Sequence, residues 1–240
     1  MVLSLACGWG LAGDTLLIAV ASNFQHPLKQ VVESYKANHS VDIQLAVGST
    51  GTLFSQIQNG APFDLLLAAD ARRPQILEEQ GLILDGTRVT YALGQLVVIS
   101  SKDLALGSWQ DVCAKLDSKT IVIANPKTAP YGEAARQVLM NMGVWQSLQG
   151  NLIQAGNVNK VFHVFRAGNA DFAFAAYSSV IANRWPTAVM VPHELYQPIS
   201  QQAVILKQSR HIEQAQAFLA FLVSPKTQSF LFELGYRKGA

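Results

Sequence analysis

The sequence predicts an α/β protein made of two lobes, each a mostly parallel sheet flanked by helices. Short apolar runs of strand length alternate with amphipathic segments of helix length from residue 16 almost to the C-terminus. This alternation is typical of strand–helix–strand units, and such units form parallel sheets. The length of 240 residues suits one large domain or two smaller lobes. Half of the residues are hydrophobic and 14% are charged, so the chain can fill a sizeable core.

Each apolar run is assigned as a strand because of its length and because a helix pattern follows it. After the first run, Leu28, Val31, Val32 and Tyr35 recur at the spacing of one helix face. Towards the C-terminus, Ser224 and the proline after it indicate the start of a last helix. The predicted strands cover residues 16–21, 41–47, 63–69, 91–100, 121–125, 151–155, 171–176 and 188–192, and a further apolar stretch covers 202–208.

The sequence shows no flexible linker and no short-period repeat, so we expect ordered strands to join the two lobes. The apolar runs at 91–100 and 202–208 are the candidates for these crossings. We therefore expect lobe 1 to contain residues 14–91 plus 205–240, and lobe 2 to contain residues 92–204.

The first residues and the charge pattern restrict the class of protein. Residues 1–13 carry no charge and are too short to span a bilayer, and their pattern predicts a signal-peptide remnant and therefore export. The net charge is +2 with scattered charges, which argues against nucleic-acid binding. Cys113 would then be the only thiol of the mature protein, and we expect it to be a buried, small apolar residue.

Four predicted strand-to-helix junctions are rich in hydroxyl, amide and glycine groups and lack Lys, Arg, His, Asp and Glu. In open α/β sheets, ligands bind beyond the carboxyl ends of the strands, where helix N-termini offer unpaired N–H groups. Several such ends can hold an anion with neutral donors alone. Ordinary helix capping explains any one junction equally well. Together they predict a site for a fully deprotonated dianion such as molybdate, tungstate or sulphate. The junctions are 21–24, 48–51, 128–132 and 156–159.

At these same residues the chain resembles the molybdate-binding proteins of bacterial ABC transporters. The resemblance runs from about residue 15 to the C-terminus, and its most recognisable block is GSTGTLFSQIQNGAPFDLLLAAD at 48–70. NPKTAPYGEAARQVL and GNVNKVFHVFRAGNADFAFAAYSSV follow in the same order. The resemblance implies a two-lobed periplasmic-binding-protein fold with the ligand cleft between the lobes.

The resemblance also implies a set of ligand donors for the oxyanion. The better-known branch of the family adds a tyrosine near the end of the strand placed here at 171–176. In this chain Ala176 stands at that position, and on a strand Tyr177 would point to the opposite face. The implied set contains hydroxyl and backbone donors at Ser22 and Ser49, adjoining amide or hydroxyl donors at Asn23 and Thr50, and backbone N–H donors at Tyr131 and Val158.

The function that the resemblance implies is that of a monomeric, periplasmic or otherwise extracytoplasmic receptor, not an enzyme. It would bind molybdate or tungstate without a cofactor and deliver the ion to the membrane permease of an ABC importer. A sulphate receptor is the alternative, since only cavity size separates these ions. An iron(III) receptor would need clustered tyrosines, and an enzyme a nucleophile and base in the cleft. The five histidines show no metal-ligand spacing.

Overall fold

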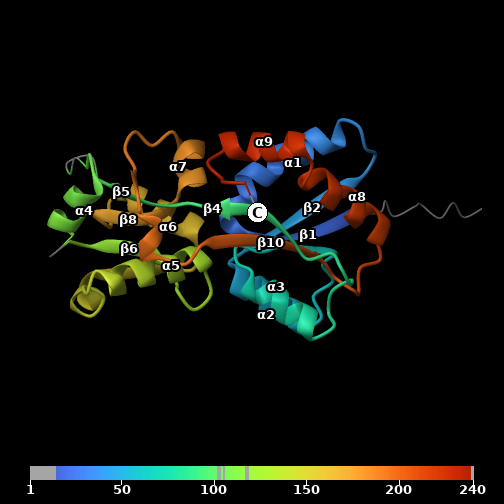
Figure 1. Cartoon of the computed structure of the whole chain (residues 1–240), viewed down its shortest axis with the longest axis horizontal. Coiled ribbons are helices and arrows are strands. Elements are labelled where there is room, and N and C mark those ends of the chain that lie inside the picture. Colours follow the sequence, from blue (N-terminus) through green and yellow to red (C-terminus); the bar gives the residue numbers. More distant parts are fainter. Residues whose placement is uncertain (1–14, 102–103, 105, 117–118, 239–240) are drawn as a thin grey trace, which may run out of the picture.

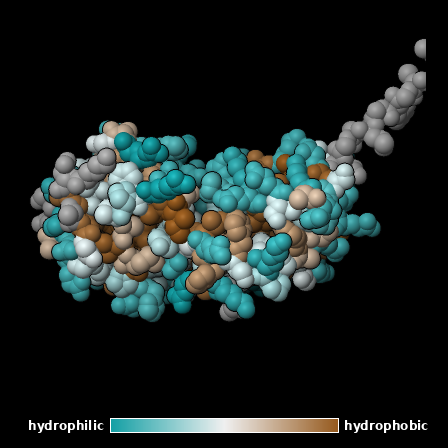
Figure 2. All heavy atoms as spheres, turned by 90° about the horizontal axis from the view of Figure 1, so that it is seen from above, coloured by the Kyte–Doolittle hydropathy of each residue, from teal (hydrophilic) through white to brown (hydrophobic). Residues whose placement is uncertain are grey.

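The computed structural model describes residues 15–101, 104, 106–116 and 119–238. The expected signal-peptide remnant at 1–13 lies outside these residues. The chain forms two lobes side by side, each around a sheet of five strands (Figure 1). Hydrophobic residues are visible near the middle of the molecule, where the lobes meet, and polar residues surround them (Figure 2).

Lobe 1 has the strand order β2-β1-β3-β10-β4. Strands β1 and β2 pair in parallel, as do β1 and β3, whereas β10 is antiparallel to both β3 and β4. Alternating apolar residues from both faces of the sheet enter two separate cores. The strands are β1 (Thr15–Ala21), β2 (Asp42–Gly48), β3 (Leu65–Leu67), β4 (Val89–Gly94) and β10 (Ile199–Ile205).

Helices cover both faces of the lobe 1 sheet (Figure 1). The predicted stripe of Leu28, Val31, Val32 and Tyr35 is buried against the sheet, and Phe218 of a C-terminal helix packs in the same core. One face carries α1 (Gln25–Lys36), preceded by the 3-10 turn η1 (Ser22–Phe24), with α8 (Ile212–Leu222) and α9 (Pro225–Glu233). The other face carries α2 (Thr50–Gln58) and α3 (Arg72–Glu79).

Lobe 2 repeats the arrangement with the order β7-β6-β8-β5-β9. Its strands are β5 (Leu96–Ser100), β6 (Ile121–Ala124), β7 (Leu152–Ala155), β8 (Phe172–Ala176) and β9 (Val189–Met190). Its helices are α4 (Trp109–Lys115), α5 (Pro130–Asn141), α6 (Val158–Arg166) and α7 (Tyr177–Asn183), with 3-10 turns η2 (Ser147–Asn151) and η3 (His193–Leu195). One large apolar core fills this lobe.

Each sheet is mostly parallel, as predicted, and contains one antiparallel strand that enters from the other lobe. Strands β5 and β10 enter their sheets directly from the neighbouring lobe and run antiparallel to the strands beside them. Strands β1 to β3 in lobe 1 and β6 to β8 in lobe 2 are joined through helices, and they pair in parallel as expected.

At both crossings, the residues at which the chain passes from one sheet to the other differ from the expected lobe boundaries. The apolar run 91–100 is two strands, because β4 ends in the lobe 1 sheet at Gly94 and β5 begins in the lobe 2 sheet at Leu96. The second crossing precedes residue 199, since all of β10 lies in the lobe 1 sheet. The apolar stretch at 202–208 lies partly inside a buried lobe 1 strand instead of spanning the lobes.

One local prediction was wrong, and one helix was not predicted. Cys113 is exposed, because the short helix α4 buries the face that carries Val112 and leaves Cys113 outside. Helix α7 was not predicted, since its first turn of Tyr177, Ser178 and Ser179 has weak helix-forming residues. The sequence SWQD at 108–111 has the form of a capping box, and the structure confirms it, with both reciprocal hydrogen bonds between Ser108 and Asp111 present.

Candidate functional site

The four polar junctions lie at the carboxyl ends of strands that are paired with each other. In lobe 1, the last residues of β1 and β2 are aligned, Ala21 opposite Gly48. In lobe 2, the last residues of β6 and β7 are aligned, Ala124 opposite Ala155. Each lobe therefore presents two neighbouring junctions at one edge of its sheet, as ligand-binding α/β sheets do.

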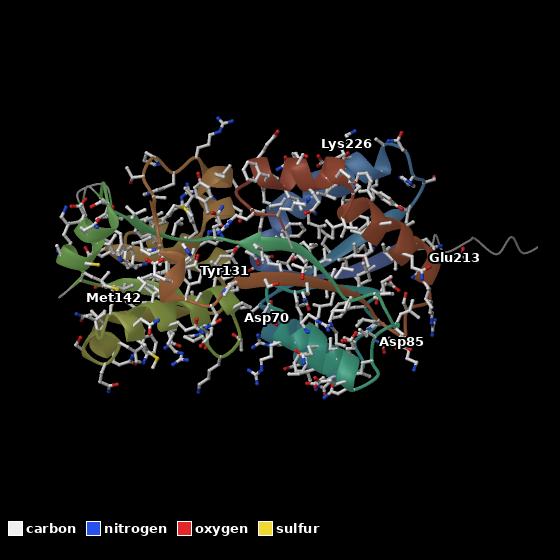
Figure 3. The ribbon with its side chains drawn as sticks, viewed as in Figure 1. Asp70, Asp85, Tyr131, Met142, Glu213 and Lys226 are labelled. Atoms are coloured by element: carbon white, nitrogen blue, oxygen red, sulfur yellow. The ribbon has the colours of Figure 1, made fainter. Side chains whose placement is uncertain are left out.

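Hydrogen bonds between the lobes bring these two pairs of junctions together. The backbone N–H of Gly51 donates to the carbonyl of Thr128 at 2.8 Å. The side-chain amide of Asn159 donates to the carbonyl of Ser22 at 2.7 Å. Both bonds join a junction of lobe 1 to a junction of lobe 2, so all four converge where the lobes meet. Tyr131 is seen there in Figure 3.

All six residues expected to hold the ligand are buried at this meeting point. Ser22, Asn23 and Ser49 are 4%, 4% and 5% exposed. The exposed fractions of the others are similarly low: Thr50 0%, Tyr131 3% and Val158 3%. A polar group costs free energy when it is buried without a partner, so hydroxyl and N–H groups gathered this way favour a bound acceptor.

In lobe 1, the donors lie on the first turn of α2 and on the turn before α1. Ser49 is the N-cap of α2, and its Oγ accepts from the N–H of Thr52 at 3.3 Å. The Oγ1 of Thr50 accepts from the N–H of Ala69 at 3.0 Å, which leaves its own hydroxyl hydrogen free to donate. Ser22 begins η1, directly after β1.

In lobe 2, Tyr131 and Val158 lie in the first turns of α5 and α6, where backbone N–H groups have no acceptor within the helix. Pro130 occupies the first position of α5 and has no N–H to satisfy. Asn157 caps α6, accepting from the N–H of Lys160 at 3.0 Å. The positive ends of both helix dipoles thus point to the region where the lobes meet, and they favour an anion.

A glycine allows α5 to begin this close to its strand. A Cβ atom on Gly132 would lie 2.1 Å from the carbonyl oxygen of Ala124, closer than any real contact. Only glycine therefore fits beside Tyr131 at this position.

Asn23 differs from the expected role of a side-chain amide donor. Its Nδ2 donates to the Oε1 of Gln201 at 3.0 Å and to the hydroxyl of Tyr236 at 3.2 Å. Both amide hydrogens are therefore used inside the protein. The network forms because Asn23, Gln201 and Tyr236 are all buried and each needs partners. The backbone carbonyl of Asn23 accepts from the Tyr236 hydroxyl at 2.9 Å, so only its backbone N–H remains to face a ligand.

One cationic side chain that the sequence pattern did not single out lies at the rim of the site. The Nη2 atom of Arg73 lies 3.0 Å from the Cβ position at Gly51, and it donates to the carbonyl of Lys127 at 3.0 Å across the lobes. Its guanidinium also forms an ion pair with Asp70, which neutralises its charge. Asp70 also accepts from the backbone N–H of Arg73 at 2.9 Å, as a helix-capping residue does.

Tyr177 is not part of the four junctions, although the next residue, Ser178, donates to the backbone carbonyl of Asn23 at 3.5 Å. Strand β8 ends at Ala176 and Tyr177 begins α7, so an argument from alternating strand faces does not apply to it. Its ring packs near Gly235, where a Cβ atom would lie 2.9 Å from the ring carbon Cδ1.

The described residues contain neither a metal-binding cluster nor a membrane-spanning helix. No group of three or more His, Cys, Asp or Glu side chains among them is placed to hold a metal ion. No helix in residues 15–238, apart from the short gaps in the description, is long and apolar enough to cross a membrane.

Comparisons with known proteins agree with this geometry. Residues 16–237 match the family model described as bacterial extracellular solute-binding protein. The chain is 36% identical to the molybdate-binding protein ModA of Rhodobacter capsulatus, over 98% of this chain and 93% of that protein. It is 38% identical to ModA of Azotobacter vinelandii, over 91% and 88%.

Solved structures show the same likeness. The periplasmic molybdate-binding protein of Azotobacter vinelandii superimposes with a TM-score of 0.88 at 32% identity, over 94% of this chain and 100% of that one. The sulfate-binding protein SubI of Mycobacterium tuberculosis has a TM-score of 0.77 at 15% identity, which shows the fold alone. The chain therefore belongs to the bacterial extracellular solute-binding protein family, and within it to the group of molybdate-binding proteins.

Proposed function

We propose that this protein is the receptor of a molybdate importer, which binds molybdate or tungstate between its lobes and delivers it to a membrane permease. The observation that carries the proposal is the convergence of four uncharged junctions, two from each lobe, in a buried region. The relatives named as molybdate-binding proteins support the choice of ion.

Neutral donors are sufficient for a dianion of this kind. Molybdate and tungstate are fully deprotonated at neutral pH, so each oxygen accepts every hydrogen bond offered. Each charge-assisted hydrogen bond contributes about 1.5–3 kcal/mol, so about six contribute roughly 9–18 kcal/mol before desolvation and lobe closure are subtracted. A remaining free energy of about −8 to −12 kcal/mol corresponds to micromolar to nanomolar affinity.

In this proposal, side-chain hydroxyl groups and backbone N–H groups both donate hydrogen bonds to the ion. Ser22 and Ser49 donate from lobe 1, with the hydroxyl of Thr50 beside them. The N–H groups of Tyr131 and Val158 donate from lobe 2. The ion thereby joins the lobes, and the free energy of its binding stabilises the closed form.

Isothermal titration with molybdate, tungstate and sulphate tests the proposal. We expect molybdate and tungstate to bind at micromolar concentration or below, and Ser22→Ala and Ser49→Ala each to weaken binding about tenfold or more. Ser229→Ala is the matched control, because the Ser229 hydroxyl bonds only within its own exposed helix turn. Absence of molybdate binding at about millimolar concentration would refute the proposal.

Sulphate remains the second candidate ligand, since the same donors suit any tetrahedral dianion. The structural likeness to a sulfate-binding protein extends to the fold alone. The titration distinguishes a molybdate receptor from a sulphate receptor, because a sulphate receptor binds sulphate more tightly than molybdate. Export to the periplasm and docking on a permease belong to the same proposal, and fractionation of cells that produce the full chain tests the location.

A further inference from the structure

A single glutamine in lobe 1 connects the ligand-binding segments of both lobes. Gln201 lies in β10, is 0% exposed, and stands where the pairing of β10 with β4 shifts register. A buried amide of this kind is stable only when its donors and acceptors are satisfied. Its hydrogen-bond partners Asn23, Tyr91 and Tyr131 are themselves buried.

The partners of Gln201 come from both sides of the site. Its Oε1 accepts from Asn23 Nδ2 at 3.0 Å and from the hydroxyl of Tyr91 at 3.0 Å, both in lobe 1. Its Nε2 donates to the hydroxyl of Tyr131 at 3.3 Å, in lobe 2. Asn23 is the neighbour of Ser22, and Tyr131 carries a backbone N–H of the proposed site.

The chain leaves room for this contact at the first crossing between the lobes. A Cβ atom on Gly94 would lie 2.3 Å from the Tyr131 hydroxyl oxygen and 2.8 Å from Gln201 Nε2. Glycine at this point lets the tyrosine of lobe 2 reach the glutamine of lobe 1.

We propose that Gln201 is a positioning residue that couples oxyanion binding to lobe closure without touching the ion. The Gln201–Tyr131 bond joins the lobes, so it stabilises the closed form and holds the first turn of α5 at the correct distance from Ser22. The bonds to Asn23 and Tyr91 fix the amide so that its Nε2 faces lobe 2. This inference rests on the proposed binding of an oxyanion between the lobes.

The test is a double-mutant cycle read by molybdate titration. Tyr131→Phe removes the hydroxyl and keeps the backbone N–H, and Gln201→Met removes the amide at similar side-chain length. We expect each change to weaken molybdate binding about five- to tenfold, and the double variant to be no weaker than Gln201→Met alone. The thermal unfolding temperature of the ligand-free Tyr131→Phe protein should stay at the wild-type value.

Gln202→Met is the matched control. Gln202 is the next residue of the same strand, and its amide bonds to Thr90 and Arg88 within lobe 1 only. We expect it to bind molybdate like the wild type. Small-angle scattering supplies a second readout: at equal, partial saturation with molybdate, Tyr131→Phe should show a smaller closed fraction than Gln202→Met.

The outcomes separate this inference from the proposed function. If the wild type binds molybdate and Tyr131→Phe binds equally well, or if the two effects simply add, the coupling role is wrong while the receptor function stands. If the wild type itself does not bind molybdate, both are wrong. Should Gln201→Met fail to fold, the affinity and closure of Tyr131→Phe decide the question alone.

Discussion

Replacing Gly51 by alanine should weaken ligand binding while leaving the free protein stable. Gly51 lies in the first turn of α2, where alanine is at least as favourable as glycine. Its N–H donates to the carbonyl of Thr128 in the other lobe at 2.8 Å. The added Cβ would lie 2.9 Å from both the Cα and the carbonyl oxygen of Thr128. The new methyl group therefore meets backbone of the opposite lobe, which cannot rotate away.

The size of the effect follows from these distances. An ordinary contact between such atoms is about 3.5–4.0 Å, so the lobes must separate locally by roughly 0.6–1 Å. That separation lengthens the Gly51–Thr128 hydrogen bond and the bonds from both lobes to the ion. The loss of one neutral bond and the weakening of one charge-assisted bond costs about 2–4 kcal/mol, or roughly 30- to 1,000-fold in affinity.

Two measurements on the same protein test this reasoning. Titration with molybdate gives the affinity, and thermal unfolding of the ligand-free protein gives its stability. Gly150→Ala is the control, because a Cβ atom at Gly150 meets nothing within 4 Å. Gly51→Ala with wild-type affinity would show that the lobes need not approach this closely to bind. A large loss of ligand-free stability would show that the clash exists before binding.

Three further results are expected. Val158 is the first residue of α6, where proline removes only the N–H, so Val158→Pro should bind molybdate about tenfold more weakly than Val158→Ala in titrations. Equal affinities would exclude that N–H as a donor. Arg73→Lys should weaken binding two- to tenfold, roughly, because the guanidinium bond to the opposite lobe is lost; tighter binding would mean that Arg73 resists closure. Burial raises the pKa of Tyr91 and Tyr236 above the usual tyrosine value, so the unfolded chain loses these protons first. The contribution of these two tyrosines to the free energy of unfolding should therefore be constant below about pH 10 and fall as the pH rises above it. Urea titrations between about pH 9 and pH 11 can measure this fall, and a rise would contradict the burial.

Most helices and strands were predictable because their signals are local. The stripe from Leu28 to Tyr35 and the capping residues at Ser108 and Ser224 depend on spacing within one element, and the structure confirms them. The division of the run 91–100 between two sheets was not predictable in this way. Both halves are buried and apolar, and only the tertiary arrangement decides which sheet each half joins.

The same distinction between local and non-local signals applies to the residues of the candidate site. The absence of charge at the four junctions is a local signal, and it led to residues that the fold brings together. The engagement of Asn23 with Gln201 and Tyr236 joins residues 178 and 213 positions apart, and nothing near Asn23 in the sequence indicates it. The approach of Arg73 to Lys127 is equally non-local, although its ion pair with Asp70 is an ordinary pairing three residues apart.

The strand delivered to lobe 1 from the far side of the molecule affects how the protein folds. Strand β10 lies between β3 and β4 in the middle of that sheet, although more than one hundred residues separate it from β4 along the chain. The sheet of lobe 2 is instead formed by one uninterrupted stretch, from β5 to β9. During synthesis the second lobe can therefore become compact first, while the amino-terminal lobe has a gap at its centre until the final fifth or so of the chain arrives. A protein shortened before residue 199 would lose the lobe at its beginning, not only its end.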